Sequence, residues 1–452
     1  MFQQPLNVQD LLDQTQISLF QKITFLILFM IAAVDGFDVS LIAYIGPSIA
    51  QEWAIQPQAL SIVFGASLLG LMTGSILFGP LADKLGTKKI LIVSLLIFSL
   101  GTLLTAQSHN VTIMAGLRFF TGLGLGGAMP ICIALSTEYA PKKRRMMMAT
   151  LSWSGFTVGI AVGGLVASQI VPSYGWRQLL LIGGIVPLML LPLILTQLPE
   201  SLQFMLSHQQ YKDKLITVLS RISGHAVPAN SRFQSPPTSS QKAGAASLFT
   251  QANRLTTLLL WLAFFSSLFT FYLLTYWLPI LFSSAFNTQK LSLVAAMLPL
   301  GGTVGAITLA LLMDARKEPF LMLSLTYFSA TLIMLIAGSL LHTGYGLFVF
   351  VFFIGFTIAG AQNGLNLIAA TIYPPQSKTT GIAWAMACGR FGSIIGSIIG
   401  AWFIAFSQHI EGFFHYLALA TLVTALAIFG LYLKHGFANH TKPSGKRIEY
   451  LD

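Results

Sequence analysis

The sequence predicts an all-α membrane protein with twelve transmembrane helices arranged as two six-helix pseudo-repeats. Of its 452 residues, 55% are hydrophobic and only 9% are charged, whereas soluble domains carry about 25% charged residues. Apolar runs that match the roughly 20 residues needed to cross a bilayer recur from residue 23 to residue 433. This composition excludes a soluble globular domain, because no water-exposed fold could bury so much apolar surface.

The predicted spans form two sets of six, separated by a polar segment. The first set covers 23–46, 58–80, 89–106, 111–132, 146–170 and 178–197, and the second covers 255–281, 291–313, 320–341, 345–368, 379–406 and 413–433. We therefore expect an N-terminal segment at 1–22, a six-helix bundle at 23–198, a linker at 199–253, a second bundle at 254–434 and a tail at 435–452. The run SPPTSSQK at 235–242 indicates that the linker is partly disordered.

Lysine and arginine residues are distributed unevenly between the two sides of the predicted bundle. The side that holds both termini and the linker carries 21 of the 25, whereas the opposite loops hold only Arg177 and Lys290. The positive-inside rule then predicts that both termini are cytoplasmic. The charges form no single basic domain, so the formal net charge of +11 does not indicate a nucleic acid partner.

Short elements recur between the two halves. Leu81–Asp83, after the second span, resembles Leu312–Asp314, which lies 231 residues later, and Tyr139–Pro141 resembles Tyr373–Pro374. Duplicated six-helix units are typical of transporters whose binding sites lie near the membrane midplane.

Small residues recur at every fourth position in four of the predicted spans. This spacing places them on one helix face and predicts close approach of neighbouring helices. The residues are Ala66, Gly70 and Gly74; Gly155, Gly159 and Gly163; Gly301 and Gly305; and Gly392, Gly396 and Gly400.

Two carboxylates, Asp35 and Asp38, lie in the otherwise apolar first span. Each costs about 2.5–3.5 kcal/mol at the bilayer centre on insertion scales. At positions i and i+3 they share one helix face, where burial and mutual repulsion favour proton uptake. We interpret them as proton-coupling residues; the alternative is a structural pair buried against a cation.

Arg118 and Arg390 are the only lysine or arginine residues that we place inside a predicted span, apart from Lys89 at the boundary of the third. A guanidinium can bind a carboxylate through two parallel hydrogen bonds and stays charged at any relevant pH. Each arginine could therefore hold a substrate anion, or could instead pair with Asp35 or Asp38. Gln362 and Asn363 are further polar residues within a span, and they either line the substrate cavity or bond between helices.

The strongest local motif is GPLADKLGTKK at Gly79–Lys89, after the second span. Its spacing of glycine, aspartate and paired basic residues resembles the loop signature of the major facilitator superfamily. We expect its glycines to allow a tight turn, and Asp83 to cap a neighbouring helix or pair with a cation. The resemblance implies a set of residues that gate conformational change: Gly79, Asp83, Gly86, Lys88, Glu138, Arg144 and Asp314.

Two further motifs are DGFD at 35–38 and GLGLGGAMP at 122–130. With Pro199–Ser201, Trp277–Pro279 and Gly389–Gly392, they resemble the aromatic acid:proton symporter family, which includes 4-hydroxybenzoate and benzoate transporters. The resemblance implies an alternating-access symporter of a bacterial-type inner membrane that imports a small organic acid, an aromatic carboxylate, together with protons. Ile131 stands where the family commonly has Asn.

Three other functions are compatible with the predicted fold. They are transport of non-aromatic carboxylates or dicarboxylates, export of drugs or metabolites, and ligand sensing by a receptor that transports nothing. We expect no enzyme activity, no cofactor and no metal, because no metal-ligand cluster or paired nucleophile and base is recognisable. The expected partners are an organic acid anion, protons and the lipid bilayer.

Overall fold

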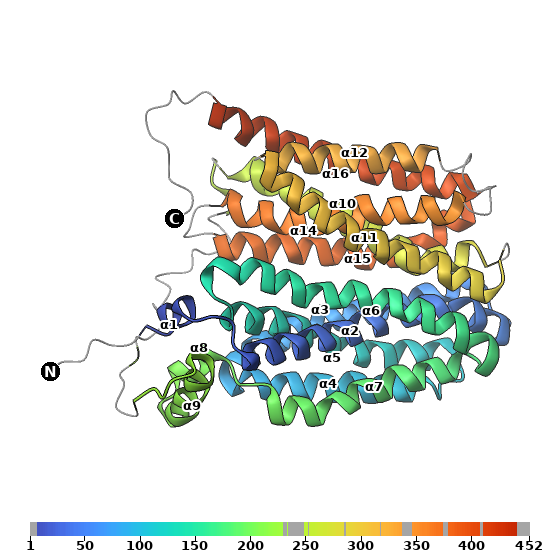
Figure 1. The fold of residues 1–452 in the computed structure, drawn as a ribbon. Helices are drawn as coiled ribbons and strands as arrows, with labels where there is room; N and C mark the ends of the chain where they lie inside the picture. The colour runs from blue at the N-terminus through green and yellow to red at the C-terminus, as the bar shows by residue number, and fades with distance from the viewer. Residues whose placement is uncertain are drawn as a thin grey trace. The chain divides into compact units, whose positions relative to one another are not determined.

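The computed structural model describes residues 7–228, 233, 248–251, 253–283, 286–316, 318–336, 346–373, 378–406 and 410–440, and its long elements are all α-helices (Figure 1). The helices of the first half are α1 (Val8–Gln14), α2 (Leu19–Glu52), α3 (Leu60–Leu85), α4 (Thr87–Thr105), α5 (Val111–Glu138), α6 (Arg145–Tyr174), α7 (Trp176–Gln197), α8 (Leu202–Ser207) and α9 (Lys212–Ser223). Those of the second half are α10 (Arg254–Leu281), α11 (Thr288–Arg316), α12 (Pro319–Leu335), α14 (Gly346–Ile372), α15 (Lys378–Phe406) and α16 (Ile410–His440).

Eleven of the described helices are long and apolar enough to cross a membrane, and α12 is a shorter apolar helix. The 17 residues of α12 extend over about 26 Å, close to the roughly 30 Å thickness of the hydrocarbon core. The predicted all-α fold is confirmed. The helices run beyond several predicted spans because polar residues continue them; α2, for example, begins at a capping box in which Ser18 and Gln21 bond each other's backbone N–H groups.

The chain divides into two compact units, Met1–Ser240 with Thr275–Ala296 and Gln241–Leu274 with Met297–Asp452. In the first unit, α2 packs against α6, α3 against α5, and α4 against α7. In the second unit, α10 packs against α15, α11 against α14, and α12 against α16. The same pairing therefore occurs in both units, as expected for duplicated six-helix elements.

Glycines bring these paired helices into backbone contact. A Cβ built on Gly159 of α6 would collide with the carbonyl oxygen of Ala33 on α2, and one built on Gly301 of α11 would collide with the backbone of α14. The close approach predicted from the spacing of small residues is confirmed at these sites. It is also confirmed at Gly70, Gly74, Gly155, Gly305, Gly392 and Gly396.

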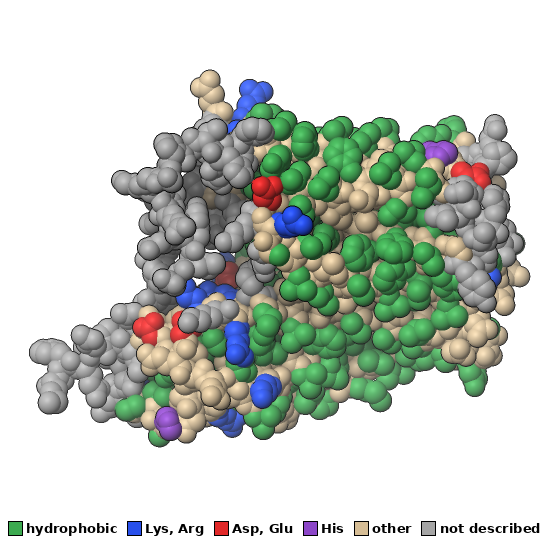
Figure 2. Space-filling view, turned by 45° about the horizontal axis from the view of Figure 1, so that its top comes forward, with side chains coloured by type: hydrophobic (Ala, Val, Ile, Leu, Met, Phe, Trp, Pro, Cys, Tyr) green, Lys and Arg blue, Asp and Glu red, His purple; other side chains and the backbone are tan. Residues whose placement is uncertain are grey.

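Apolar side chains cover the flanks of the helices, and most visible charged side chains lie toward the helix ends (Figure 2). On α4, for example, Val93, Leu96 and Leu100 are all exposed and share one face. Such a face is stable next to acyl chains and costly in water.

The start of the expected linker is folded. Helices α8 and α9 lie beyond one end of the long helices of the first unit, near α1 (Figure 1). Leu215, Leu219 and Ile222 form a buried stripe along α9, and the glycine at position 224 ends this helix in a left-handed conformation. The run at 235–242 lies outside the described residues.

Candidate functional site

A buried ion pair joins Asp38 on α2 to Arg118 on α5. Arg118 Nη2 donates to Asp38 Oδ2 at 2.8 Å and Nη1 donates to Oδ1 at 3.2 Å, which makes the contact bidentate. The two side chains are 0% and 1% exposed, respectively. Of the roles left open by the sequence, pairing with Asp38 is therefore the one Arg118 performs in this conformation.

Two neighbouring helices complete this cluster. Thr102 of α4 donates its hydroxyl to Asp38 Oδ1 at 2.6 Å, and Arg118 Nε donates to Ser67 Oγ of α3 at 3.2 Å. Asp35 lies one turn earlier on α2 and is 1% exposed. Burying an ion pair costs desolvation energy that its attraction only partly offsets, so such a pair is weak evidence of stabilisation. Removing either partner would leave the other charge buried and unpaired, which is strongly destabilising.

A second polar cluster lies in the other unit. Arg390 of α15 donates to the hydroxyl of Tyr272 on α10 at 3.4 Å. Gln362 Oε1 of α14 accepts a hydrogen bond of 2.8 Å from Ser267 Oγ, which lies 2.6 Å from the hydroxyl of Tyr327. The structure thus brings Arg390 and Gln362 each into contact with α10. The side chain of Asn363 lies outside the described residues.

The two intramembrane arginines differ in charge compensation. The guanidinium of Arg118 forms an ion pair with the carboxylate of Asp38. Among the side chains that the structure describes, no carboxylate pairs with Arg390, whose guanidinium is half-buried. An uncompensated guanidinium within a membrane helix is costly and can bind an anion.

The predicted gating motif has a different geometry from the one expected. Gly79 lies inside α3, so the expectation that it allows a turn is wrong: the helix continues through Leu85. Only Gly86, with φ +104°, forms the break between α3 and α4. A Cβ there would also come within 2.8 Å of Glu200 Oε2. Gly86 is therefore needed both for its backbone conformation and for its lack of a side chain.

Glu200 occupies the position at the N-terminus of α4 that we expected Asp83 to fill. Its Oε1 accepts from the backbone N–H groups of Lys88 and Ser201, each at 3.0 Å. Lys88 Nζ donates to the carbonyl of Leu195 at 2.8 Å. A carboxylate near a helix N-terminus is stabilised by the helix dipole. In the described part of the chain, the exposed Asp83 side chain makes no hydrogen bond or ion pair.

Glu138 connects the end of α5 to the same region. Its Oε2 accepts from Ser201 Oγ at 2.7 Å. The adjacent Tyr139 donates its hydroxyl to the carbonyl of Glu200 at 2.6 Å, and burial raises the pKa of this hydroxyl well above its ordinary value. Because Tyr139 stays protonated, it remains a donor at any physiological pH. Lys88, Glu138, Tyr139, Glu200 and Ser201 are called the loop network below.

Arg144 and Asp314 are two further predicted gating residues. Arg144 is exposed in the short 3-10 turn Lys142–Arg144 between α5 and α6. Asp314 lies on α11, and its side chain is outside the described residues. The motif Pro199–Ser201 indicates only a family resemblance and does not predict the role of Glu200 at the N-terminus of α4. A signal was present: this carboxylate follows directly after the last span of the first half.

Comparison with known proteins identifies the class. The family model described as Major Facilitator Superfamily matches residues 28–376 and, in a second match, 260–449. The chain belongs to this superfamily of membrane transporters, and it is therefore a multi-pass transporter and not an enzyme. The xylose transporter XylE from E. coli, in a partially occluded inward-open conformation, has the same fold, with a TM-score of 0.69, 16% identity, and coverage of 95% of this chain and 100% of that one.

Relatives with higher identity are transporters of aromatic acids. The gallate transporter of Pseudomonas putida is 36% identical over 426 residues, covering 94% of each chain. The 4-hydroxybenzoate transporter PcaK of Pseudomonas putida is 34% identical over 441 residues, covering 96% of this chain and 97% of the relative. The resemblance to aromatic acid transporters of the superfamily is confirmed.

Proposed function

We propose that this protein is a proton-coupled symporter that imports an aromatic carboxylate by alternating access. The proposal is carried by a difference between the two membrane arginines. The charge of Arg118 is compensated by Asp38, whereas no described carboxylate compensates the charge of Arg390. The similarity to a gallate transporter and a 4-hydroxybenzoate transporter supports an aromatic substrate.

Arg390 is the proposed primary contact for the substrate carboxylate. Its guanidinium can present two parallel N–H groups to the anion. Tyr272, already within hydrogen-bond distance of Arg390, offers an aromatic ring and a hydroxyl beside it. Gln362 and Asn363 are proposed to line the same site from α14. A hydroxyl group on the substrate ring would find hydrogen-bond partners in such side chains.

Asp38 and Asp35 are the proposed proton-coupling residues. Protonation of Asp38 would remove the charge that holds Arg118, whose fork would then be available to an anion. Proton binding and anion binding would in this way favour each other. A monovalent anion that moves with one proton carries no net charge, so such a cycle draws on the pH difference alone.

The loop network, together with Asp83, Arg144 and Asp314, is the proposed gate. The excess of basic residues supports a cytoplasmic location for this end and for both termini, in a bacterial-type inner membrane. The proposed moving bodies are the six-helix bundles 23–198 and 254–434, connected by the linker 199–253.

Uptake of labelled 4-hydroxybenzoate into proteoliposomes with an acidic exterior tests the proposal. We expect accumulation that a protonophore abolishes, and competition by benzoate-like acids but not by their neutral amides. Arg390→Lys keeps the charge but loses the bidentate fork, so the half-saturation concentration should rise about tenfold or more. Asp35→Asn and Asp38→Asn should each abolish accumulation driven by the pH difference.

Four results would contradict parts of this proposal. Better competition by sugars or organic cations than by any carboxylate would exclude organic acid transport. Better competition by aliphatic dicarboxylates would exclude only the aromatic substrate. Wild-type accumulation by both aspartate variants would exclude the proton-coupling assignment. Specific ligand binding without accumulation in a sealed vesicle would indicate a receptor.

A further inference from the structure

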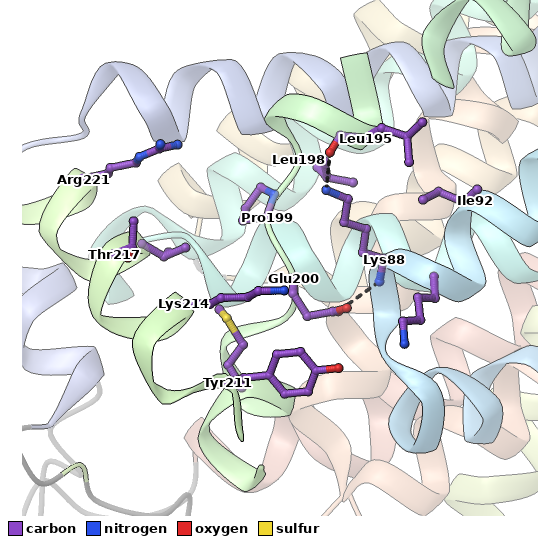
Figure 3. A pocket seen from close by; sticks show the side chains of 13 residues that line it. Lys88, Ile92, Leu195, Leu198, Pro199, Glu200, Tyr211, Lys214, Thr217 and Arg221 are labelled. Carbon is purple, nitrogen blue, oxygen red and sulfur yellow. Dashed lines mark hydrogen bonds between the residues drawn. The ribbon is translucent and has the colours of Figure 1, made fainter. Parts of the chain in front are cut away.

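A basic pocket lies at the end of the first unit where α3 and α4 meet. It has a volume of about 630 Å³ and is formed by the start of α4, the end of α7, the segment before α8, and α9 (Figure 3). Four cationic side chains line it: Lys88, Lys89, Lys214 and Arg221. Its single carboxylate, Glu200, is engaged by two backbone N–H groups. The pocket therefore has a positive balance of charge.

The cations reach the pocket from different elements. Lys89 and Lys88 come from the first turn of α4, whereas Lys214 and Arg221 come from α9. Figure 3 shows Lys88 bonded to the Leu195 carbonyl and its backbone bonded to Glu200. Lys89, Lys214 and Arg221 are exposed, and no carboxylate pairs with them among the described side chains. Lys214 and Arg221 instead lie over the rings of Tyr211 and Phe20, at 5.4 and 5.9 Å. The pocket lining thus holds three cations whose charge no described carboxylate compensates.

Apart from Tyr211 and Thr217, the remaining lining is apolar, and part of it is exposed on the flank of the long helices. Ile92 and Leu195 line the pocket, and Leu195 is 57% exposed. On α4, Lys89 continues into the exposed face of Val93, Leu96 and Leu100. Spacings of four, three and four residues keep these side chains on one side of the helix. A ligand in the pocket can therefore be continuous with acyl chains along this face.

We propose that this pocket binds the phosphate headgroup of an anionic phospholipid. The charges fit a phosphodiester, and the apolar edge fits the start of its acyl chains. A soluble anion would use the cations but not the apolar edge. At the cytoplasmic surface, each Lys or Arg of a basic cluster raises the affinity for anionic lipids about fivefold. A bound headgroup would join α9 to α4 and α7 beside the loop network, so lipid composition would influence the proposed gate.

Titration of the purified full-length protein in mild detergent with dioleoylphosphatidylglycerol tests this proposal. Binding is followed by native mass spectrometry and by the melting temperature. We expect a saturable rise in melting temperature that added salt reduces. The combined variant Lys89→Gln, Lys214→Gln and Arg221→Gln should lose affinity by roughly a hundredfold. Lys212→Gln, on the same helix but outside the pocket lining, is the matched control and should bind as the wild type does.

Three outcomes would overturn the proposal. Equal stabilisation by dioleoylphosphatidylcholine, which has the same chains, would show that the anionic charge is not recognised. Wild-type affinity of the triple variant for phosphatidylglycerol would place the lipid elsewhere. Equal stabilisation by inorganic phosphate at the same concentration would identify a soluble-anion site. If the triple variant does not fold, the single variant Lys214→Gln decides, with an expected loss of about fivefold. These measurements require no transport activity.

Discussion

Replacing Asp38 by Asn removes one charge of the buried pair and leaves Arg118 charged, at 1% exposure, without its counter-ion. Breaking a buried ion pair from one side costs about 3–5 kcal/mol of unfolding free energy. Arg118→Gln, which strands the carboxylate instead, should cost a similar amount. The double variant leaves neither charge behind, so it should lie within about 1–2 kcal/mol of the wild type.

The assay is equilibrium unfolding of the purified wild type, the two single variants and the double variant in detergent. The values above imply a coupling energy of at least about 4 kcal/mol. The ion pair between Glu52 and Arg177 is the matched control, because its N–O distance is also short, at 2.7 Å, but its side chains are 43% and 38% exposed. The same cycle there should give less than about 1 kcal/mol. Additive effects of the Asp38 and Arg118 substitutions, within about 0.5 kcal/mol, would refute the reasoning.

Three further predictions concern packing, gating and topology. Gly159→Ala should destabilise the protein by about 1–3 kcal/mol through its contact with α2, whereas Gly116→Ala, with no atom within 4 Å of the added Cβ, should not; equal melting temperatures would contradict this. Asp83→Asn should lower the maximal uptake rate more than it raises the half-saturation concentration, and the reverse pattern would exclude a gating role. Tags at both termini should resist labelling from outside intact cells; labelling of either would contradict the predicted topology.

The fold could be predicted from the sequence because lipid allows few alternatives. Backbone groups in the bilayer must be satisfied within each segment, so an apolar run of sufficient length is a helix. The close approach of helices could also be predicted, since glycines such as Gly159 and Gly301 recur at a spacing of four residues, on one helix face. Which helices pair could not be predicted from this spacing. Helix ends were less predictable, because capping residues such as Ser18 extend helices beyond the apolar runs.

The contacts of the site were less predictable. Asp35 and Asp38 lie on one face of α2, and periodicity cannot decide which of them faces Arg118; the side chains of Ser67 and Thr102, on two other helices, complete the arrangement. Glu200 takes the position expected for Asp83 because the chain after α7 folds back onto the start of α4, and no local pattern describes that return. The helix α9 could have been found, since its apolar residues follow helical spacing within a polar segment.

The separation of Asp38 and Arg118 along the chain has a consequence for biosynthesis. The two residues are 80 positions apart, and at about 5–20 residues per second a ribosome needs roughly 4–16 s to add the intervening segment. During this interval α2 has been made, but the arginine that compensates its aspartate does not yet exist. An ionised aspartate costs about 2.5–3.5 kcal/mol at the bilayer centre, and α2 lacks compensation for this charge until α5 has been made. The charge compensation of the first membrane span thus depends on the synthesis of the fourth.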